Sequence, residues 1–160
     1  MSKRPTADEY FLRLALITST RSTCARRAVG CLLVDERNHV LATGYNGPPS
    51  GFPHCIETPC EGAYAESGSA LSECEAIHAE MNALLQCRDV YSIKSVYCSA
   101  SPCNYCIRHL LNTSAERIVF QIEYPHVKAK QLWLANGREW LQVNVWCIIS
   151  KRYVMRSEPF

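Results

Sequence analysis

The chain has 160 residues, 48% of them hydrophobic, which is enough for one domain with a buried core, and we expect that domain to span residues 1–160. Its 17 Lys and Arg against 15 Asp and Glu leave a net charge of +2, so no strong attraction to nucleic acid or to a membrane surface is expected. The sequence has no apolar run near the roughly 18 residues of a membrane-spanning helix and no signal-peptide segment at its start, which predicts a cytoplasmic protein whose cysteines are reduced or bound to metal.

Helix and strand patterns alternate along the chain. Thr6 and Glu9 form a T-x-x-E capping box ahead of the first helix. The apolar face of that helix is expected around Phe11, Leu14, Ala15 and Thr18. In chain order, the predicted elements are a helix over 10–20, strands over 29–34 and 40–43, a helix from 78, a strand over 95–99, a helix over 103–111, a strand over 117–120, a helix over 125–135 and a strand over 141–149. This alternation predicts a three-layer α/β/α sandwich around a mixed sheet of roughly five strands.

An insertion over about residues 44–77 separates the second strand from the second helix and is rich in Gly, Pro, Ser and Cys. A loop of this length inside a compact domain is usually functional. Four thiolates would complete the tetrahedral shell of a structural zinc ion, and the candidates are Cys24, Cys55, Cys60 and Cys74. His54 could replace Cys55, and the alternative is a set of reduced cysteines without a metal. Four other cysteines are expected to be packing residues: Cys31, Cys87, Cys98 and Cys147.

A second group of metal-ligand residues follows the insertion. His78 opens a helical segment, and Cys103 and Cys106 stand three residues apart, so that both thiolates face the same way on a first helical turn. One imidazole and two thiolates leave the fourth position of a tetrahedral zinc ion open for water, as in a catalytic site. Glu80 is the accompanying general base, although residues two apart on a regular helix do not share a face, so the spacing does not explain how Glu80 reaches that water.

These residues in this order are typical of zinc-dependent nucleobase deaminases. A lone C-x-x-C is often a structural or redox pair, and a lone H-x-E is usually a solvated helix face, but their combination favours catalysis. Zinc lowers the pKa of a bound water to about 7. The resulting hydroxide would attack C4 of a cytosine ring, while Glu80 would move a proton to N3 and then to the departing amino group.

Four segments resemble the deoxycytidylate (dCMP) deaminase family, and the resemblance runs from about residue 10 to about residue 125. They are RSTCARRAVG over 21–30, GYNGPPSGF over 44–52, HAEMNALL over 78–85 and SPCNYC over 101–106. The resemblance implies hydrolysis of dCMP to dUMP and ammonia, which supplies thymidylate synthesis. It also implies a second zinc ion in the insertion, and a hexamer that dCTP activates and dTTP inhibits, with Mg²⁺ accompanying the nucleotide effector.

The resemblance also implies how the substrate is held. Asn46 would bond the deoxyribose hydroxyl or the base edge, the Ala79 N–H would bind the base carbonyl, and the Ser101 carbonyl would accept the leaving amine. Arg26 and Tyr124 are the candidates near the 5′-phosphate, because arginine suits bidentate phosphate binding. Each of these residues also has an ordinary structural interpretation. Asn46 with Gly47 is a common turn dipeptide, and Tyr124 could be a core residue. The arginines at 26 and 27 could be a solvated pair, and the sequence does not separate them.

Past Tyr124 the resemblance ends. Trp133, Trp140 and Trp146 either pack the last helix on the last strand or form a subunit interface. Two other functions share the zinc motifs: deamination of a base in nucleic acid, such as a tRNA adenosine or a DNA cytosine, and nucleotide binding by a zinc-stabilised module without catalysis. The nearly neutral charge disfavours the first, and the presence of Glu80 disfavours the second.

Overall fold

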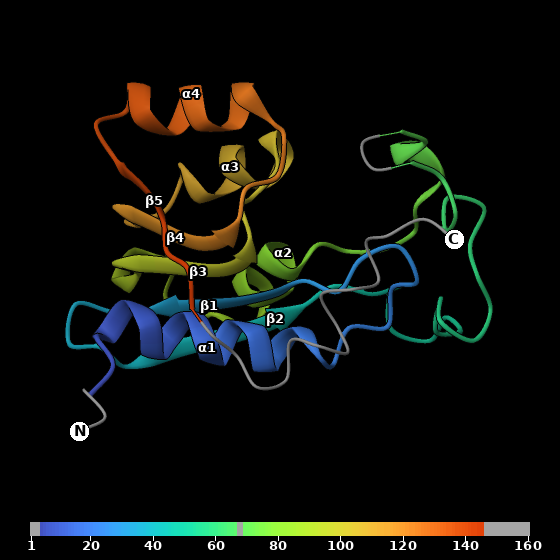
Figure 1. The fold of residues 1–160 in the computed structure, drawn as a ribbon, viewed down its shortest axis with the longest axis horizontal. Helices are drawn as coiled ribbons and strands as arrows, with labels where there is room; N and C mark the ends of the chain where they lie inside the picture. The colour runs from blue at the N-terminus through green and yellow to red at the C-terminus, as the bar shows by residue number, and fades with distance from the viewer. Residues whose placement is uncertain (1–3, 67–68, 146–160) are drawn as a thin grey trace.

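A five-stranded sheet forms the centre of the computed structural model, which describes residues 4–66 and 69–145 (Figure 1). The strands run in the order β2-β1-β3-β4-β5, with β1 antiparallel to both β2 and β3, and with β4 parallel to both β3 and β5. The elements are α1 (Ala7–Ser19), β1 (Gly30–Val34), β2 (Val40–Tyr45), α2 (Ala79–Gln86), β3 (Ser95–Ala100), α3 (Asn104–Leu110), β4 (Arg117–Ile122), α4 (Val127–Ala135) and β5 (Glu139–Gln142), with short 3₁₀ turns at Leu71–Glu73 and Val90–Ser92. Helices cover both faces of this mixed sheet, which confirms the predicted three-layer sandwich.

Helix α1 covers one face of the sheet, and its start is the predicted capping box. Thr6 Oγ1 accepts a hydrogen bond from the backbone N–H of Glu9, and the Glu9 carboxylate accepts one from the N–H of Thr6. The buried side is centred one position from the predicted face and consists of Phe11, Leu12, Ala15, Leu16 and Ser19. This face packs on Leu32, Tyr97 and Val119 of the sheet. Gly30 allows the close approach, because a Cβ there would lie 2.1 Å from the Ala15 carbonyl oxygen.

The other face of the sheet carries α2, α3 and α4. Trp133 is completely buried there and its indole N–H donates to the Glu139 carbonyl at 2.8 Å, while the Trp140 ring packs against Phe120. The packing interpretation of these two tryptophans therefore holds, and Trp146 lies outside the described residues. Among the predicted packing cysteines, Cys31 and Cys98 are fully buried partners across β1 and β3, Cys87 caps the end of α2, and Cys147 lies outside the described residues.

The last strand differs from its prediction. The apolar run predicted a strand over 141–149. In the structure, β5 pairs with β4 only from Glu139 to Gln142, and residues 143–145 do not belong to a strand. Val145 is instead buried against the α1 side of the sheet. Val145 is therefore apolar because it packs in the core after the strand has ended, and not because it belongs to the strand. Residues 146–149 lie outside the described range.

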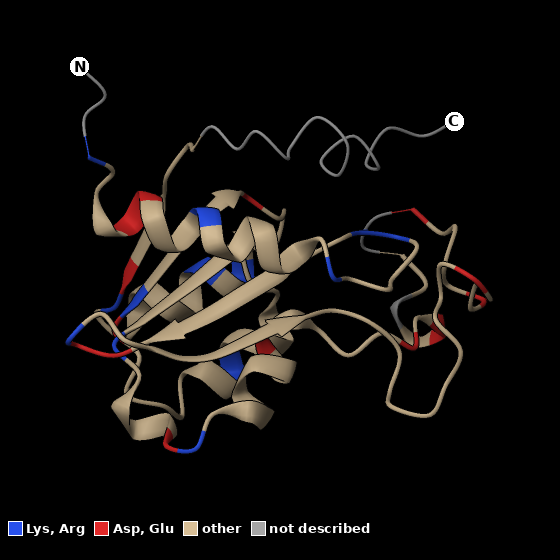
Figure 2. Ribbon diagram, turned by 90° about the horizontal axis from the view of Figure 1, so that it is seen from below, with Lys and Arg blue, Asp and Glu red and all other residues tan. Residues whose placement is uncertain are grey.

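The starts of α2 and α3 lie at the same end of the sheet, next to the insertion between β2 and α2 (Figure 1). Gly44 of β2 allows α2 to approach closely, because a Cβ there would lie 2.2 Å from the Ala79 oxygen and 2.4 Å from the Ala83 nitrogen. Basic and acidic residues are interspersed along the ribbon (Figure 2). Across residues 4–66 and 69–145, the structure contains no helix with the length and apolarity to cross a membrane.

Candidate metal centre

Three predicted ligands converge where α2 and α3 begin. His78 is the N-cap of α2, Cys103 is the N-cap of α3, and Cys106 lies in the first turn of α3. The His78 Nδ1 atom is 3.4 Å from the Sγ atom of each cysteine, and the three ligand atoms all lie within 4.8 Å of one another. A tetrahedral zinc ion with bonds of about 2.0 Å to nitrogen and 2.3 Å to sulfur places its ligands about 3.5 Å apart. The donor types and their separations therefore fit Zn²⁺.

The electrostatics of the three ligands also suit a cation. A hydrogen bond from Cys106, with a further one from His78, lowers the pKa of Cys103 to about 3. The same shared hydrogen bond, together with burial, raises the pKa of the Cys106 thiol. The hydrogen bond to Cys103 raises the pKa of His78. One thiolate is thus already favoured at the site, and a zinc ion would displace the protons from the other two ligands.

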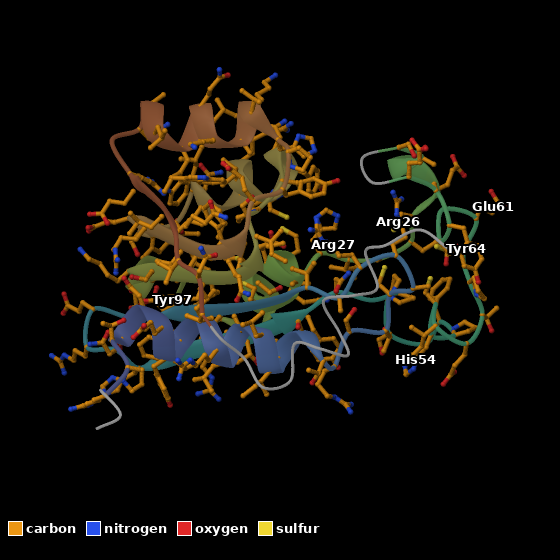
Figure 3. The ribbon with its side chains drawn as sticks, in the orientation of Figure 1. Arg26, Arg27, His54, Glu61, Tyr64 and Tyr97 are labelled. Carbon is orange, nitrogen blue, oxygen red and sulfur yellow. The ribbon has the colours of Figure 1, made fainter. Side chains whose placement is uncertain are left out.

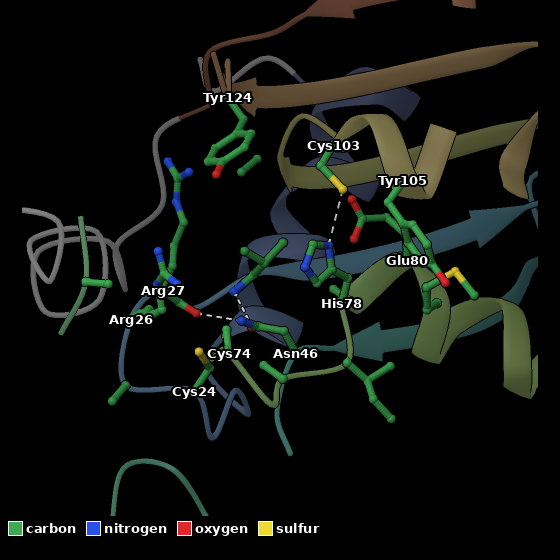
Figure 4. A pocket seen from close by; sticks show the side chains of 18 of the residues that line it. Cys24, Arg26, Arg27, Asn46, Cys74, His78, Glu80, Cys103, Tyr105 and Tyr124 are labelled. Atoms are coloured by element: carbon green, nitrogen blue, oxygen red, sulfur yellow. Dashed lines mark hydrogen bonds between the residues drawn. The ribbon is translucent and has the colours of Figure 1, made fainter. Parts of the chain in front are cut away.

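Glu80 is buried beside these ligands, with only 3% of its surface exposed (Figure 4). Burial raises the pKa of its carboxyl group, against the opposing effect of nearby His78. The helix geometry explains how Glu80 reaches the site although it is two residues from His78. His78 precedes α2 with an extended backbone (φ −68°, ψ 152°), so the two residues are not on successive positions of one regular helix.

A pocket of about 1800 Å³ extends from the metal ligands to the insertion, and all five residues predicted to bind substrate line it. This volume exceeds the roughly 300–1,000 Å³ of an ordinary small-molecule site, so the pocket has room for more than a metal ion and one pyrimidine ring. Those five residues are Arg26, Asn46, Ala79, Ser101 and Tyr124.

Asn46 anchors the strand-to-loop junction as well as lining the pocket. Its side-chain oxygen accepts hydrogen bonds from Ser22 Oγ and from the Val29 N–H, and its Nδ2 donates to the Arg27 carbonyl. A side-chain amide has two N–H donors, so one remains for a ligand. Ala79 is the first residue of α2, where its N–H has no acceptor within the helix, and Ser101 Oγ accepts from the Tyr124 N–H.

The two adjacent arginines have different surroundings. Arg26 donates from Nη2 to the carbonyl oxygens of Glu66 and Ser69, so its guanidinium is used within the insertion. The Arg27 guanidinium lies over the Tyr124 ring at 5.3 Å, and no residue in the described part of the chain accepts a hydrogen bond from it (Figure 4). Burial lowers the pKa of Arg27, which indicates a partly desolvated cation. Arg27 was not selected in the sequence, and His126, which stacks on Tyr124 at 5.1 Å in the same pocket, carried no sequence signal.

The cysteines of the insertion are only partly brought together. Cys55 and Cys60 are in contact, with 3.7 Å between their sulfur atoms. Burial raises the pKa of the Cys24 thiol, and the neighbouring Cys74 and Cys55 thiols raise it further. Cys55 is buried, whereas the His54 side chain is 56% exposed and faces Glu57 (Figure 3). Within the described residues, only the group of His78 and its two cysteines has three ligand atoms mutually within 4.8 Å.

Comparisons with known proteins agree with this geometry. The sequence profile of the cytidine and deoxycytidylate deaminase zinc-binding region matches residues 5–122. The chain is 38% identical over 125 residues to the deoxycytidylate deaminase of Schizosaccharomyces pombe, covering 76% of this chain and 38% of that protein. It is 38% identical over 126 residues to the deoxycytidylate deaminase of Mycobacterium phage D29, covering 75% of this chain and 98% of the phage protein. The chain thus spans about two fifths of the yeast relative and nearly all of the phage relative.

Solved structures show the same fold. The apo dCMP deaminase of cyanophage S-TIM5 superposes with a TM-score of 0.68 at 26% identity, covering 88% of this chain and 100% of that one. The structure of the same cyanophage enzyme in complex with dCMP and dUMP superposes equally well, with a TM-score of 0.68 at 24% identity, over 89% of this chain and all of that one.

Proposed function

The chain belongs to the cytidine and deoxycytidylate deaminase family, and on that basis we propose that it hydrolyses dCMP to dUMP and ammonia. The observation that carries the proposal is the convergence of His78, Cys103 and Cys106 beside the buried carboxyl group of Glu80. Arg27, at the far side of the same pocket, supplies a cation for a phosphate. The relatives named deoxycytidylate deaminase support the choice of nucleotide.

His78, Cys103 and Cys106 would hold Zn²⁺, and the ion would lower the pKa of a water molecule bound to it to about 7. Glu80 takes one proton from the attacking water and delivers it to N3 of the cytosine, where it stays, and it then moves the second proton, from the new C4 hydroxyl, to the departing amino group, so that the C4–N bond breaks as the C4 carbonyl forms. The burial that raises the pKa of Glu80 suits a carboxyl group that holds a proton during the reaction. The imidazole of His78 and the thiolates of Cys103 and Cys106 would hold the metal at the start of both helices.

The rest of the pocket positions the nucleotide. The Ala79 N–H is the donor for the base carbonyl, the Ser101 carbonyl is the acceptor for the amine, and the remaining N–H of Asn46 is the donor for the deoxyribose hydroxyl. Arg27 and Tyr124 take the 5′-phosphate. Arg26 holds the insertion against the pocket through two backbone carbonyls instead.

The test is loss of absorbance when zinc-loaded protein is given dCMP, dCTP, deoxycytidine or a single-stranded oligonucleotide. We expect dCMP to be converted fastest, because the pocket combines the metal ligands with Arg27, whose guanidinium has no hydrogen-bond acceptor among the described residues. Glu80→Gln should lower kcat about 10²–10⁴-fold while zinc content stays unchanged, since the carboxyl group moves a proton and is not a ligand. Preferred deamination of the oligonucleotide, or wild-type turnover by Glu80→Gln, would show that the proposal is wrong.

We also propose a second, structural zinc ion held by Cys24, Cys55, Cys60 and Cys74. The contact between Cys55 and Cys60 supports it, as does the pKa of Cys60, which the backbone N–H of Glu75 lowers toward the thiolate form that binds metal. Elemental analysis should find two zinc ions per chain. Cys60→Ser should retain one ion together with deaminase activity at low temperature, whereas one ion in the wild-type protein would contradict the second site.

Assembly and control complete the proposal. The resemblance to the family suggests a cytoplasmic hexamer that dCTP with Mg²⁺ activates and dTTP inhibits. Sedimentation velocity should give a mass of six chains, and dCTP with Mg²⁺ should lower the KM for dCMP. A monomer with a KM that neither nucleotide changes would contradict both parts.

A further inference from the structure

The ring of His126 lies in the pocket, and the fold leaves its nitrogen atoms unused. His126 directly precedes α4, but its side chain makes no capping hydrogen bond to that helix. The half-buried ring lines the pocket together with Arg27 and Tyr124. Neither ring nitrogen has a hydrogen-bond partner among residues 4–66 and 69–145, and neither is closed off from the molecular surface. The imidazole is therefore accessible to a ligand that enters the pocket.

Two nitrogen-bearing groups pack on the ring of Tyr124. The guanidinium of Arg27 lies over that ring, 5.3 Å from its centroid (Figure 4). The His126 ring lies 5.1 Å from it, tilted by 32°. The backbone N–H of His126 donates to the Tyr124 carbonyl oxygen at 2.7 Å, so a tight turn fixes the two rings relative to each other. Tyr124 thus holds an arginine and a histidine side by side in one pocket.

A phosphate group has a use for both side chains. It carries three strong acceptor oxygens, and a bidentate guanidinium bonds two of them. The third oxygen is left for another donor, and an imidazole has an N–H in its neutral and in its protonated form. Resting on the proposed function, we infer that His126 donates an N–H to the 5′-phosphate and, with Arg27, makes the pocket selective for a nucleoside 5′-monophosphate over the nucleoside.

The surroundings of Arg27 favour an anion at this place. Burial lowers the pKa of its guanidinium, because the charged form is partly removed from water and has no anionic partner among the described residues. A phosphate beside it would offset this desolvation cost. Donors that packing holds in place also lose less freedom when a ligand binds. Stacking on Tyr124 therefore prepares both groups for the phosphate.

The experiment separates hydrogen bonding by His126 from its stacking. His126→Phe keeps a ring against Tyr124 and removes both nitrogens, whereas His126→Gln keeps an N–H donor and removes the ring. His109→Phe is the matched control, because His109 stacks on Tyr105 at 4.8 Å but does not line the pocket. Calorimetry on zinc-loaded protein measures the Kd values of dUMP and deoxyuridine, which differ only in the phosphate and are not consumed.

We expect His126→Phe to weaken dUMP binding about tenfold and deoxyuridine binding less than about twofold, as for the loss of one hydrogen bond to a charged group. The KM for dCMP should rise by a similar factor while kcat stays unchanged. His126→Gln should recover part of the lost dUMP affinity, because its amide still donates. His109→Phe should leave the ratio of the two Kd values as it is in the wild-type protein.

Two results would overturn the assignment. A wild-type ratio of the two Kd values in both His126 variants would show that the imidazole does not contact the phosphate. An equal loss of dUMP and deoxyuridine affinity would show that His126 only shapes the pocket. The proposed function fails separately, if the wild-type protein does not deaminate dCMP, since the two Kd values are measured without turnover.

Discussion

Adjacent Arg26 and Arg27 perform different tasks, and this difference gives a prediction at the scale of single residues. Arg27→Met should raise the KM for dCMP about 10–100-fold, because it removes the one cation that faces Tyr124 without a hydrogen-bond acceptor among the described residues. Deoxycytidine, which has no phosphate, should be deaminated at the wild-type rate. Steady-state kinetics with the two substrates measure this difference.

Arg26→Met is the matched control for this experiment. Its guanidinium bonds the Glu66 and Ser69 carbonyls, so its loss should lower the Tm and should reduce turnover of dCMP and deoxycytidine by the same factor. A selective loss of dCMP turnover in Arg26→Met, with Arg27→Met unaffected, would assign the phosphate contact to Arg26 instead of Arg27.

The positions of the site residues could be predicted from the sequence only where their spacing along the chain determines how their side chains are arranged. The three-residue separation of Cys103 and Cys106 places both sulfur atoms on one helical turn, and the structure has them there. Neighbouring residues of a non-helical segment point to different sides, and the side that faces a pocket depends on distant residues. For this reason the sequence could not separate Arg26 from Arg27, or His54 from Cys55.

Among the elements, α2 matters most because it carries His78 and Glu80 against β2. Gly44→Ala should destabilise the fold by about 1–3 kcal/mol and weaken zinc binding. The added methyl would meet backbone atoms of Ala79 and Ala83, so the helix itself must shift. Urea unfolding and competition for zinc with a chelator measure the two effects.

Thr43→Ala is the control on the same strand, because the Thr43 side chain is exposed. It should change the stability by less than about 0.5 kcal/mol and leave zinc affinity unchanged. If Gly44→Ala bound zinc and unfolded like the wild-type protein, the close packing of α2 on β2 would not be what positions the metal ligands.

Element boundaries were predictable where a local signal exists. The capping box places the start of α1, and the apolar run before the Asp35 turn places β1. The sequence of the insertion has no helix or strand periodicity from which its structure could be predicted. Individual backbone hydrogen bonds hold it instead, such as those between Gly47 and Ile77 and from Gly62 to Glu73. The end of β5 was missed because apolar residues beyond it pack on α1 rather than continue the ladder.

At the scale of the whole molecule, alternating helices and strands were sufficient to predict the layers, but not the order β2-β1-β3-β4-β5. Strand order and direction depend on pairings between distant segments, for which one sequence carries no local signal. The ion pair between Asp8 and Arg117 is such a long-range contact, since it joins α1 to β4 across 109 residues. Arg117 also bonds Glu139 of β5, and the Tyr97 hydroxyl donates to Asp8, at the end of the molecule away from the insertion (Figure 3).

This ion pair predicts how the stability of the fold depends on pH. Burial raises the pKa of Asp8, but the hydrogen bonds from Arg117 and Tyr97 outweigh it and lower the pKa below that of the unfolded chain. The stabilisation is therefore fully present above the unfolded value of about 3.9 and is lost as the pH falls through the lower folded value. A double-mutant cycle with Asp8→Asn and Arg117→Met should give a coupling of about 1–2 kcal/mol at pH 7.

Urea unfolding of the four proteins in the cycle, repeated between pH 7 and pH 2, measures the coupling. It should be constant down to about pH 4 and shrink below it, because a protonated Asp8 no longer carries the charge that Arg117 binds. The Asp8→Asn protein should accordingly lose less stability than the wild type over the acid range. A coupling that stays the same at pH 2 would mean that packing, rather than the charge of Asp8, joins α1 to the far strands.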